Sequence, residues 1–174
     1  MAPKGTGTRP ATDRIRETLF AILEPSLPGA RVLDLFAGAG TLGIEALSRG
    51  AVHATFVERS KEALAALETN LRATGFSDRA DIARTNVLAF LDRPVATPYD
   101  IVLCDPPFAD VDVLEAALGR LAVIDALYPD SRVVARVLRK HRPTTPPSAR
   151  VVRTKEIGEE DIIFLRYSDA GGGG

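Results

Sequence analysis

The sequence contains one cysteine, Cys104, and two histidines, His53 and His141, in 174 residues. A single cysteine excludes an internal disulfide and a cysteine-based zinc cluster, and the two histidines lie too far apart in the chain to have metal-ligand spacing. Cys104 ends an apolar run that starts at Ile101, so we interpret it as a core residue rather than a reactive thiol. We therefore predict no metal site.

Long apolar runs are absent as well. No stretch approaches the ~18 residues that a membrane span requires, and residues 1–8 are polar and glycine-rich, unlike a secretory signal. We therefore expect a cytoplasmic protein that does not enter a membrane. With 45% hydrophobic and 26% charged residues, the composition is that of an ordinary globular protein. We expect a single domain over residues 9–168 that acts as a monomer, with flexible segments at residues 1–8 and 169–174.

A large net charge is missing too, because 22 Lys and Arg residues nearly balance 23 Asp and Glu residues, giving a formal net charge of −1. This balance argues against a protein that coats nucleic acid by bulk electrostatics. The distribution is uneven, however, since residues 131–155 contain eight basic residues and no acidic one. Such a segment is either a solvated basic face or a contact for nucleic acid, and the sequence leaves both open.

Segments with strand character alternate with segments of helical spacing along the chain. Thr12 is placed to cap a first helix, whose apolar residues recur every three or four positions. We expect strands at 31–36, 54–57, 81–84, 99–104 and 132–138, helices at 42–47, 61–71, 87–91 and 111–121, and a terminal antiparallel hairpin of 151–152 with 162–165. Alternating strands and helices imply a parallel sheet covered on both faces. The expected fold class is α/β, a doubly wound, mostly parallel, Rossmann-like sheet, in which ligands bind at the carboxyl ends of the strands.

Gly38 to Gly43 form a G-x-G-x-x-G sequence between a predicted strand and a predicted helix, which is the pattern of a dinucleotide-binding loop. Asp34 interrupts the strand before this loop, and a carboxylate there is poorly placed for a pyrophosphate but suits a cationic ligand. S-adenosylmethionine (AdoMet) carries a sulfonium and an ammonium group and no phosphate. The pattern Asp34-x-Phe36-x-Gly38-x-Gly40 therefore favours AdoMet, with these four residues as candidate cofactor contacts. A dinucleotide-dependent oxidoreductase is the alternative that the glycine pattern supports.

Further candidate cofactor contacts follow the next two strands. Glu58, with Arg59 beside it, ends the second predicted strand. A carboxylate at this position accepts hydrogen bonds from both ribose hydroxyls, in NAD and AdoMet alike, so it predicts a nucleoside without identifying it. Asn86 follows the third strand, where it is placed either to reach the adenine edge or to cap the next helix.

Asp105-Pro106-Pro107-Phe108 follows the buried run of residues 99–104. Two consecutive prolines restrict the backbone and remove two donors. A base amino group is a poor nucleophile because its lone pair is delocalised into the ring, so acceptors aimed at its N–H bonds favour the transition state. We predict that the Asp105 carboxylate and the Pro106 carbonyl oxygen are those acceptors, and that Phe108 stacks on an unstacked or flipped base. The four residues form the predicted catalytic motif for methyl transfer to an exocyclic amino group.

These motifs resemble those of the bacterial small-subunit ribosomal RNA guanine-N2 methyltransferases, the RsmD-type family. The most specific similarity is in residues 9–20, RPATDRIRETLF, which resemble the family signature R-P-T-T-D-R-V-R-E-x-L-F with one change at Ala11. The similarity continues through VLDLFAGAG and IEALSRGA, and the Asp-Pro-Pro-Phe motif completes it.

The resemblance implies a class I AdoMet-dependent methyltransferase that acts on N2 of a guanine in 16S rRNA. The implied partner is ribosomal RNA, either free or in the assembled or assembling small ribosomal subunit. The resemblance also implies AdoMet binding at Asp34, Gly38, Gly40 and Glu58. It further implies that the first segment contacts RNA through Arg9, Thr12, Arg14 and Arg16.

The sequence departs from the family pattern at two places. Relatives usually begin with a basic stretch near R-I-I-A-G-x-x-x-G-R, which does not precede Arg9 here, and they often have a glutamate in the strand after the catalytic motif, where residues 134–137 read VARV. A DNA methyltransferase acting on adenine N6 or cytosine N4 is the main alternative, because Asp-Pro-Pro-aromatic serves that chemistry as well. A non-catalytic RNA-binding protein with the same fold is a further alternative.

Overall fold

The structure of the protein is a computed structural model that describes residues 8–168, with side chains from Thr12 onward. The segments predicted to be flexible, residues 1–8 and 169–174, lie outside the described part of the chain, except that Thr8 begins the first helix.

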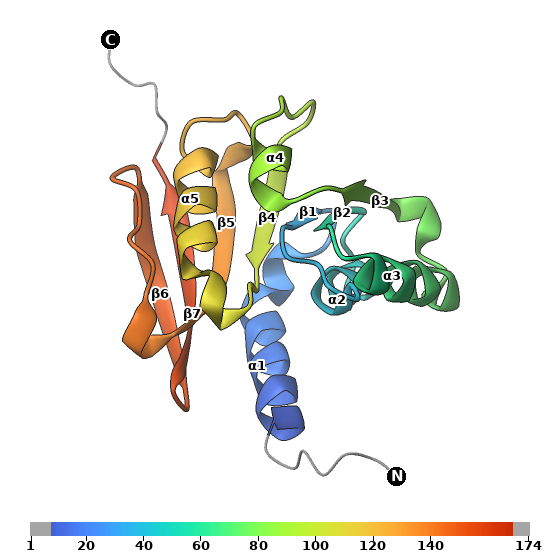
Figure 1. The fold of residues 1–174 in the computed structure, drawn as a ribbon, viewed down its shortest axis with the longest axis horizontal. Helices are drawn as coiled ribbons and strands as arrows, with labels where there is room; N and C mark the ends of the chain where they lie inside the picture. The colour runs from blue at the N-terminus through green and yellow to red at the C-terminus, as the bar shows by residue number, and fades with distance from the viewer. Residues whose placement is uncertain (1–7, 169–174) are drawn as a thin grey trace.

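The described residues form one sheet of seven strands, with helices on both of its faces (Figure 1). The strands are β1 (Arg31–Asp34), β2 (His53–Glu58), β3 (Ala80–Arg84), β4 (Tyr99–Cys104), β5 (Leu127–Leu138), β6 (Ala149–Ile157) and β7 (Glu160–Tyr167). Their order is β3-β2-β1-β4-β5-β7-β6. Neighbours from β3 to β5 are parallel, and β7 pairs antiparallel with both β5 and β6. The predicted doubly wound α/β class with a terminal antiparallel hairpin is confirmed.

Five α-helices within residues 8–168 cover the sheet. They are α1 (Thr8–Leu23), α2 (Thr41–Ser48), α3 (Lys61–Thr74), α4 (Val87–Leu91) and α5 (Val111–Leu121). Short 3-10 turns are η1 (Glu24–Ser26), η2 (Ser77–Arg79), η3 (Phe108–Asp110) and η4 (Arg139–His141). No helix in this part of the chain has both the length and the apolar character to cross a membrane.

Two apolar clusters hold the helices against the sheet. Residues of α1, α2 and α3 share one cluster, whose largest fully buried side chains are Phe20, Phe56 and Phe164. Residues of α4 and α5 pack with Cys104 in the other cluster. Burying one such ring stabilises the fold by roughly 1.5–3 kcal/mol. Because Cys104 is buried and its burial raises the pKa of the thiol, its interpretation as a core residue is confirmed.

The first helix begins earlier than the sequence pattern predicted. We expected Thr12 to cap it, but α1 starts at Thr8, so Thr12 lies inside the helix. Pro10 falls in the first turn, where an N–H has no intrahelical partner in any case, so the helix tolerates it there. Thr12 therefore lines a neighbouring cavity instead of capping the helix.

The strand order reverses between β1 and β4, which are hydrogen-bonded neighbours although β2 and β3 lie between them in sequence. Asp34 at the end of β1 lies in register with Phe56 of β2 and Leu103 of β4. The carboxyl ends of these three strands therefore meet at one edge of the sheet. In doubly wound sheets this reversal is where ligands bind.

Two glycines let α2 approach β2 and α3 closely. Gly40 has a positive φ of 87° at the N-cap of α2, and a Cβ there would lie 2.3 Å from the Leu67 Cδ1 atom. A Cβ on Gly43 would lie 2.3 Å from Cε1 and 2.8 Å from Cζ of Phe56. The Phe56 ring is fully buried. These glycines therefore fix the position of the helix that follows the loop.

We expect Gly43→Ala to lower the free energy of unfolding by about 1–3 kcal/mol, because α2 must move away from the Phe56 ring. Urea unfolding followed by circular dichroism measures this change. The matched control is Gly119→Ala in α5, where a Cβ meets nothing within 4 Å. That substitution should instead stabilise the protein by about 0.5–1 kcal/mol, as expected for a helical glycine. Equal effects of the two substitutions would contradict the role given to Gly43.

Candidate active site

A cavity of about 690 Å³ lies at the carboxyl ends of β1, β2 and β4. Its lining includes most of the residues that the sequence singled out: Phe36, Gly38, Glu58, Arg59, Asn86 and all four residues from Asp105 to Phe108. Thr85, Asp110 and Arg136 also line it and were not predicted. The structure therefore brings the predicted cofactor loop and the predicted catalytic motif to the walls of one cavity.

Glu58 ties the glycine loop to the end of β2. Its Oε2 atom accepts a hydrogen bond from the Gly38 amide at 2.8 Å, and its Oε1 atom accepts from the amides of Arg59 and Ser60, each at 2.8 Å. A carboxylate has about four lone-pair sites, so acceptor capacity remains beyond these three bonds. Since Glu58 also lines the cavity, it is placed to accept hydrogen bonds from a ligand there.

Asp34 lies beneath the loop instead of in the lining of the cavity. Its side chain is 1% exposed, its Oδ2 atom accepts from the Gly43 amide at 3.1 Å, and its buried Oδ1 atom has no hydrogen-bond partner among the described residues. The pKa of Asp34 is raised to about 7, mainly by burial and in part by the nearby Asp105 and Glu58 carboxylates, while the Gly43 hydrogen bond opposes the rise. Its predicted contact with a cofactor stays a prediction, while its support of the loop is visible.

Gly40 and Asn86 have local structural roles. The Gly40 amide donates to the Ala37 carbonyl at 2.8 Å and closes the turn before α2. Gly40 itself is not part of the cavity lining. The Asn86 Oδ1 atom accepts from the Ala89 amide at 2.8 Å and caps α4, which was one of its two predicted roles. Asn86 also lines the cavity, so its other predicted role, at the adenine edge, stays a prediction.

The predicted catalytic motif leaves β4 as an extended segment and turns into η3. Pro107 has φ −52° and ψ 140°, and its carbonyl accepts from the Asp110 amide at 2.9 Å, which sets the turn. Phe108 is 39% exposed, as is Tyr128, whereas the other aromatic side chains of the described residues are buried or half-buried. The motif therefore holds a carboxylate and a partly open aromatic ring together at the wall of the cavity.

Arg136 is the main site residue that sequence reasoning missed. Its Nε and Nη2 atoms bond the two Glu160 oxygens at 2.8 and 3.1 Å, its Nη1 atom lies 3.7 Å from Asp105 Oδ1, and its guanidinium lies over the Phe108 ring at 5.4 Å. Burial raises the pKa of Asp105, Arg136 opposes that rise, and Glu160 adds to it. Cys104 pairs in register with Ala135, so the next residues along the two strands, Asp105 and Arg136, lie side by side. Predicting this contact from the sequence would have required the strand order and register.

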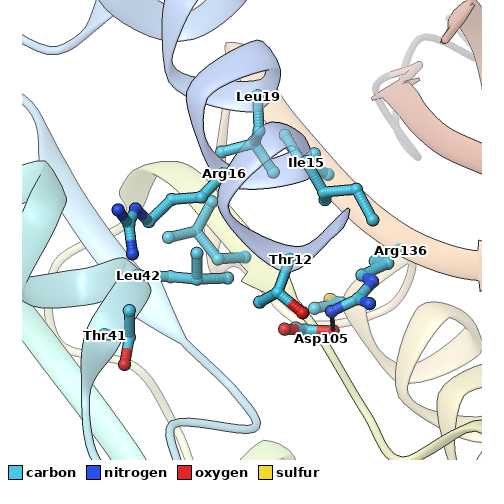
Figure 2. Close-up of a pocket in the computed structure, with 11 residues that line it drawn as sticks. Thr12, Ile15, Arg16, Leu19, Thr41, Leu42, Asp105 and Arg136 are labelled. Carbon is cyan, nitrogen blue, oxygen red and sulfur yellow. Dashed lines mark ion pairs between the residues drawn. The ribbon is translucent and has the colours of Figure 1, made fainter. Parts of the chain in front are cut away.

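A smaller cavity of about 160 Å³ lies between α1 and the sheet and shares Asp105 and Arg136 with the larger one (Figure 2). Thr12 points toward Asp105 and Arg136 in this view, whereas Arg16 extends toward Thr41 and Leu42 (Figure 2). Thr12 therefore lies near Asp105 of the predicted catalytic motif.

The basic side chains predicted to contact RNA diverge. Arg16 makes ion pairs with Asp13 at 3.5 Å and with Glu45 of α2 at 4.0 Å, so it is directed at the protein. Arg14 is exposed. Arg9 lies in α1, but its side chain is outside the described part of the structure. The RNA contacts of this segment stay a prediction. In residues 8–168 no group of three His, Cys, Asp or Glu side chains is placed to hold a metal ion.

Comparisons with known proteins place the chain in a family. The family model described as Conserved hypothetical protein 95 matches residues 1–166. The Ribosomal RNA small subunit methyltransferase D of Escherichia coli strain K12 is 39% identical over 163 residues, covering 90% of this chain and 78% of that protein. The protein of the same name from Haemophilus influenzae is 35% identical over 154 residues, covering 87% and 79%.

A solved structure is similar to this chain in fold as well as in sequence. The Escherichia coli protein yhhF has a TM-score of 0.81 and 36% identity, over 94% of this chain and 89% of that one. The chain therefore belongs to the Conserved hypothetical protein 95 family, the RsmD-type family of methyltransferases that its motifs predicted.

Proposed function

We propose that the protein transfers a methyl group from AdoMet to the N2 amino group of a guanine in small-subunit ribosomal RNA. The observation that carries this proposal is the position of Asp105 and Phe108, which lie together on the wall of the cavity that the glycine loop also lines. The names of the relatives support the substrate class, since they refer to the RNA of the small ribosomal subunit. A substrate of this kind supports the expectation of a cytoplasmic protein.

The charges around the cavity fit AdoMet better than a dinucleotide. Asp34, Glu58 and Asp105 lie close enough for Asp105 and Glu58 to raise the pKa of Asp34, so their field disfavours a pyrophosphate and favours a cation. The Asp34 Oδ1 atom is buried without a partner among the described residues, which costs less free energy when a positive charge binds nearby. Bound AdoMet supplies an electrophilic methyl group on a sulfonium. Glu58 is placed to bind the ribose of AdoMet. The glycine loop at Gly38, which is hydrogen-bonded to Glu58, is placed to lie beside that ribose.

The side chains of the motif supply positioning and hydrogen-bond acceptors. In the proposed reaction the Asp105 carboxylate and the Pro106 carbonyl accept from the two N–H bonds of the amino group, which favours the developing positive charge on nitrogen. Phe108 offers its exposed ring for stacking, which contributes roughly 1–3 kcal/mol per base. Arg136 lies over that ring and counters the pKa rise of Asp105, so it favours the ionised carboxylate.

We expect Asp105→Ala to lower the rate of methyl transfer by about 10²–10³-fold, because an acceptor that acts in the transition state is lost. Asp105→Asn keeps one acceptor oxygen without charge and should have an intermediate rate. Tritiated AdoMet and small-subunit particles measure the rate, and calorimetry measures AdoMet binding, which both variants should keep. Normal turnover of Asp105→Ala would contradict the mechanism.

The substrate class is tested by competition. Small-subunit particles and duplex DNA oligonucleotides are mixed in one assay, and the proposal predicts that the tritium enters the RNA. Transfer of tritium to DNA would instead support a DNA methyltransferase that acts on adenine N6 or cytosine N4, because Asp-Pro-Pro-aromatic serves that chemistry as well. Binding of NAD without binding of AdoMet in calorimetry would support an oxidoreductase.

Arg136 and Glu160 should move the acid side of the pH–rate profile in opposite directions. Asp105 must be ionised to act, so activity falls as pH drops through its pKa. Arg136 lowers that pKa and Glu160 raises it. We therefore expect Arg136→Met to move the acid limb to higher pH and Glu160→Gln to move it to lower pH, measured as kcat/KM against pH. The exposed Arg93→Met is the control, and shifts of the same sign in both site variants would refute this role.

AdoMet affinity should rise with pH through the pKa of Asp34, which is about 7. A cation favours the ionised carboxylate, so binding releases a proton below this pKa, and affinity increases by at most about tenfold per pH unit before it levels off. Calorimetry from about pH 6 to about pH 8 measures the effect. Asp34→Asn should remove this rise, whereas the exposed Asp78→Asn should retain it. A flat profile for the unaltered protein would exclude an electrostatic role for Asp34.

A further inference from the structure

The last three strands of the sheet carry two sets of basic side chains, one that runs across the strands β5, β7 and β6 and one that runs along β6. Arg150 of β6 pairs directly with Arg166 of β7. Val133 of β5 pairs with Leu165, and one step further in the same register Arg132 lies beside Arg166. Three arginines therefore stand side by side across β5, β7 and β6.

The same face continues along β6. Arg153 pairs with Phe164 and Lys155 with Ile162, and partners across antiparallel strands point to the same face. Phe164 is buried in the cluster that contains the apolar residues of α1, which identifies the face as the α1 side of the sheet. We call the five residues Arg132, Arg150, Arg153, Lys155 and Arg166 the basic face.

The basic face lacks counter-charges within the described structure. No ion pair or hydrogen bond of its five side chains is formed with residues 12–168, whereas Arg136 is paired with Glu160, and Arg139 and Arg142 with Asp161. Glu156 alternates to the other face of β6, where it lies opposite Asp161. Like charges directly opposite on neighbouring strands destabilise a sheet. The arrangement therefore costs stability unless an anion binds.

Protection of the sheet edge does not explain the whole face. Charged side chains on an edge strand prevent pairing with other chains, and this accounts for Arg150, Arg153 and Lys155 on β6. Arg166 and Arg132 lie on β7 and β5, which are interior strands with neighbours on both sides. A polyanion that crosses several strands accounts for all five.

We propose that the basic face binds the phosphate backbone of the RNA substrate, a role that rests on the proposed function. Lys155, Ile162 and Arg136 lie in one row, so Lys155 is about 10 Å from Arg136, two strand spacings away. Arg136 in turn contacts Asp105. A strand of RNA whose base enters the active site can therefore continue over the basic face, which fixes its position without reading its sequence.

The test compares two double variants with equal changes in charge. Arg150→Gln with Arg153→Gln alters the basic face, and Arg72→Gln with Arg93→Gln removes two exposed charges from α3 and from the segment after α4. Fluorescence anisotropy with transcribed small-subunit rRNA gives the affinity over a range of salt. The first variant should bind about tenfold more weakly, and its slope of log affinity against log salt should be roughly 1–2 units shallower.

Other readouts separate this role from loss of fold or catalysis. The melting temperature of the basic-face variant should be unchanged or higher, since repulsion is relieved, and kcat at saturating RNA and AdoMet affinity should be unchanged. Affinity and salt slope equal to those of the control variant would overturn the proposal. The proposal would also be overturned if the basic-face variant bound small-subunit particles more weakly but naked rRNA as well as the unaltered protein does, since the basic face would then contact a ribosomal protein.

Failure of the proposed function gives a different result. In that case the unaltered protein would not methylate rRNA, while the anisotropy measurement would still report whether the basic face binds RNA.

Discussion

Two carboxylates from neighbouring strands hold the glycine loop, and the rest of the site depends on them. Glu58 at the end of β2 accepts from the Gly38 amide, and Asp34 at the end of β1 accepts from the Gly43 amide. These bonds fix the start and the end of the loop against the sheet. The packing of Gly43 on Phe56 then sets the position of α2. Because the loop is held in this way, contacts within the protein define one wall of the cavity.

The same carboxylates give the site its electrostatic character. Asp34, Glu58 and Asp105 converge where the strand order reverses, and their repulsion together with burial raises the pKa of Asp34. Such an arrangement is unfavourable without a cation, which is the property that separates AdoMet from a dinucleotide as the ligand. Arg136 offsets part of this charge at Asp105, and Glu160 in turn holds Arg136 through an ion pair. Arg136 therefore lines the acidic cavity and lies in the same row of the sheet as Lys155 of the basic face.

Much of the fold followed from the sequence because its signals are local. The helix over residues 111–121 and the strand over residues 99–104 were predicted with the bounds that the structure has. The start of α1 was not, because a proline in the first turn is tolerated without a distinct signal. Arg136 and the row of arginines across β5, β7 and β6 depend on strand order and register, which no short window of sequence contains. Asp34 was recognised as an acidic residue at the loop, but its burial beneath the loop is a tertiary property.

The identity of the methylated nucleoside tests the central claim most directly. Small-subunit rRNA is incubated with the protein and AdoMet that carries a deuterated methyl group, then digested to nucleosides and examined by mass spectrometry. The proposed chemistry predicts the deuterated methyl group on N2-methylguanosine. Label on an adenosine or cytidine amino group, or no label in rRNA at all, would contradict it.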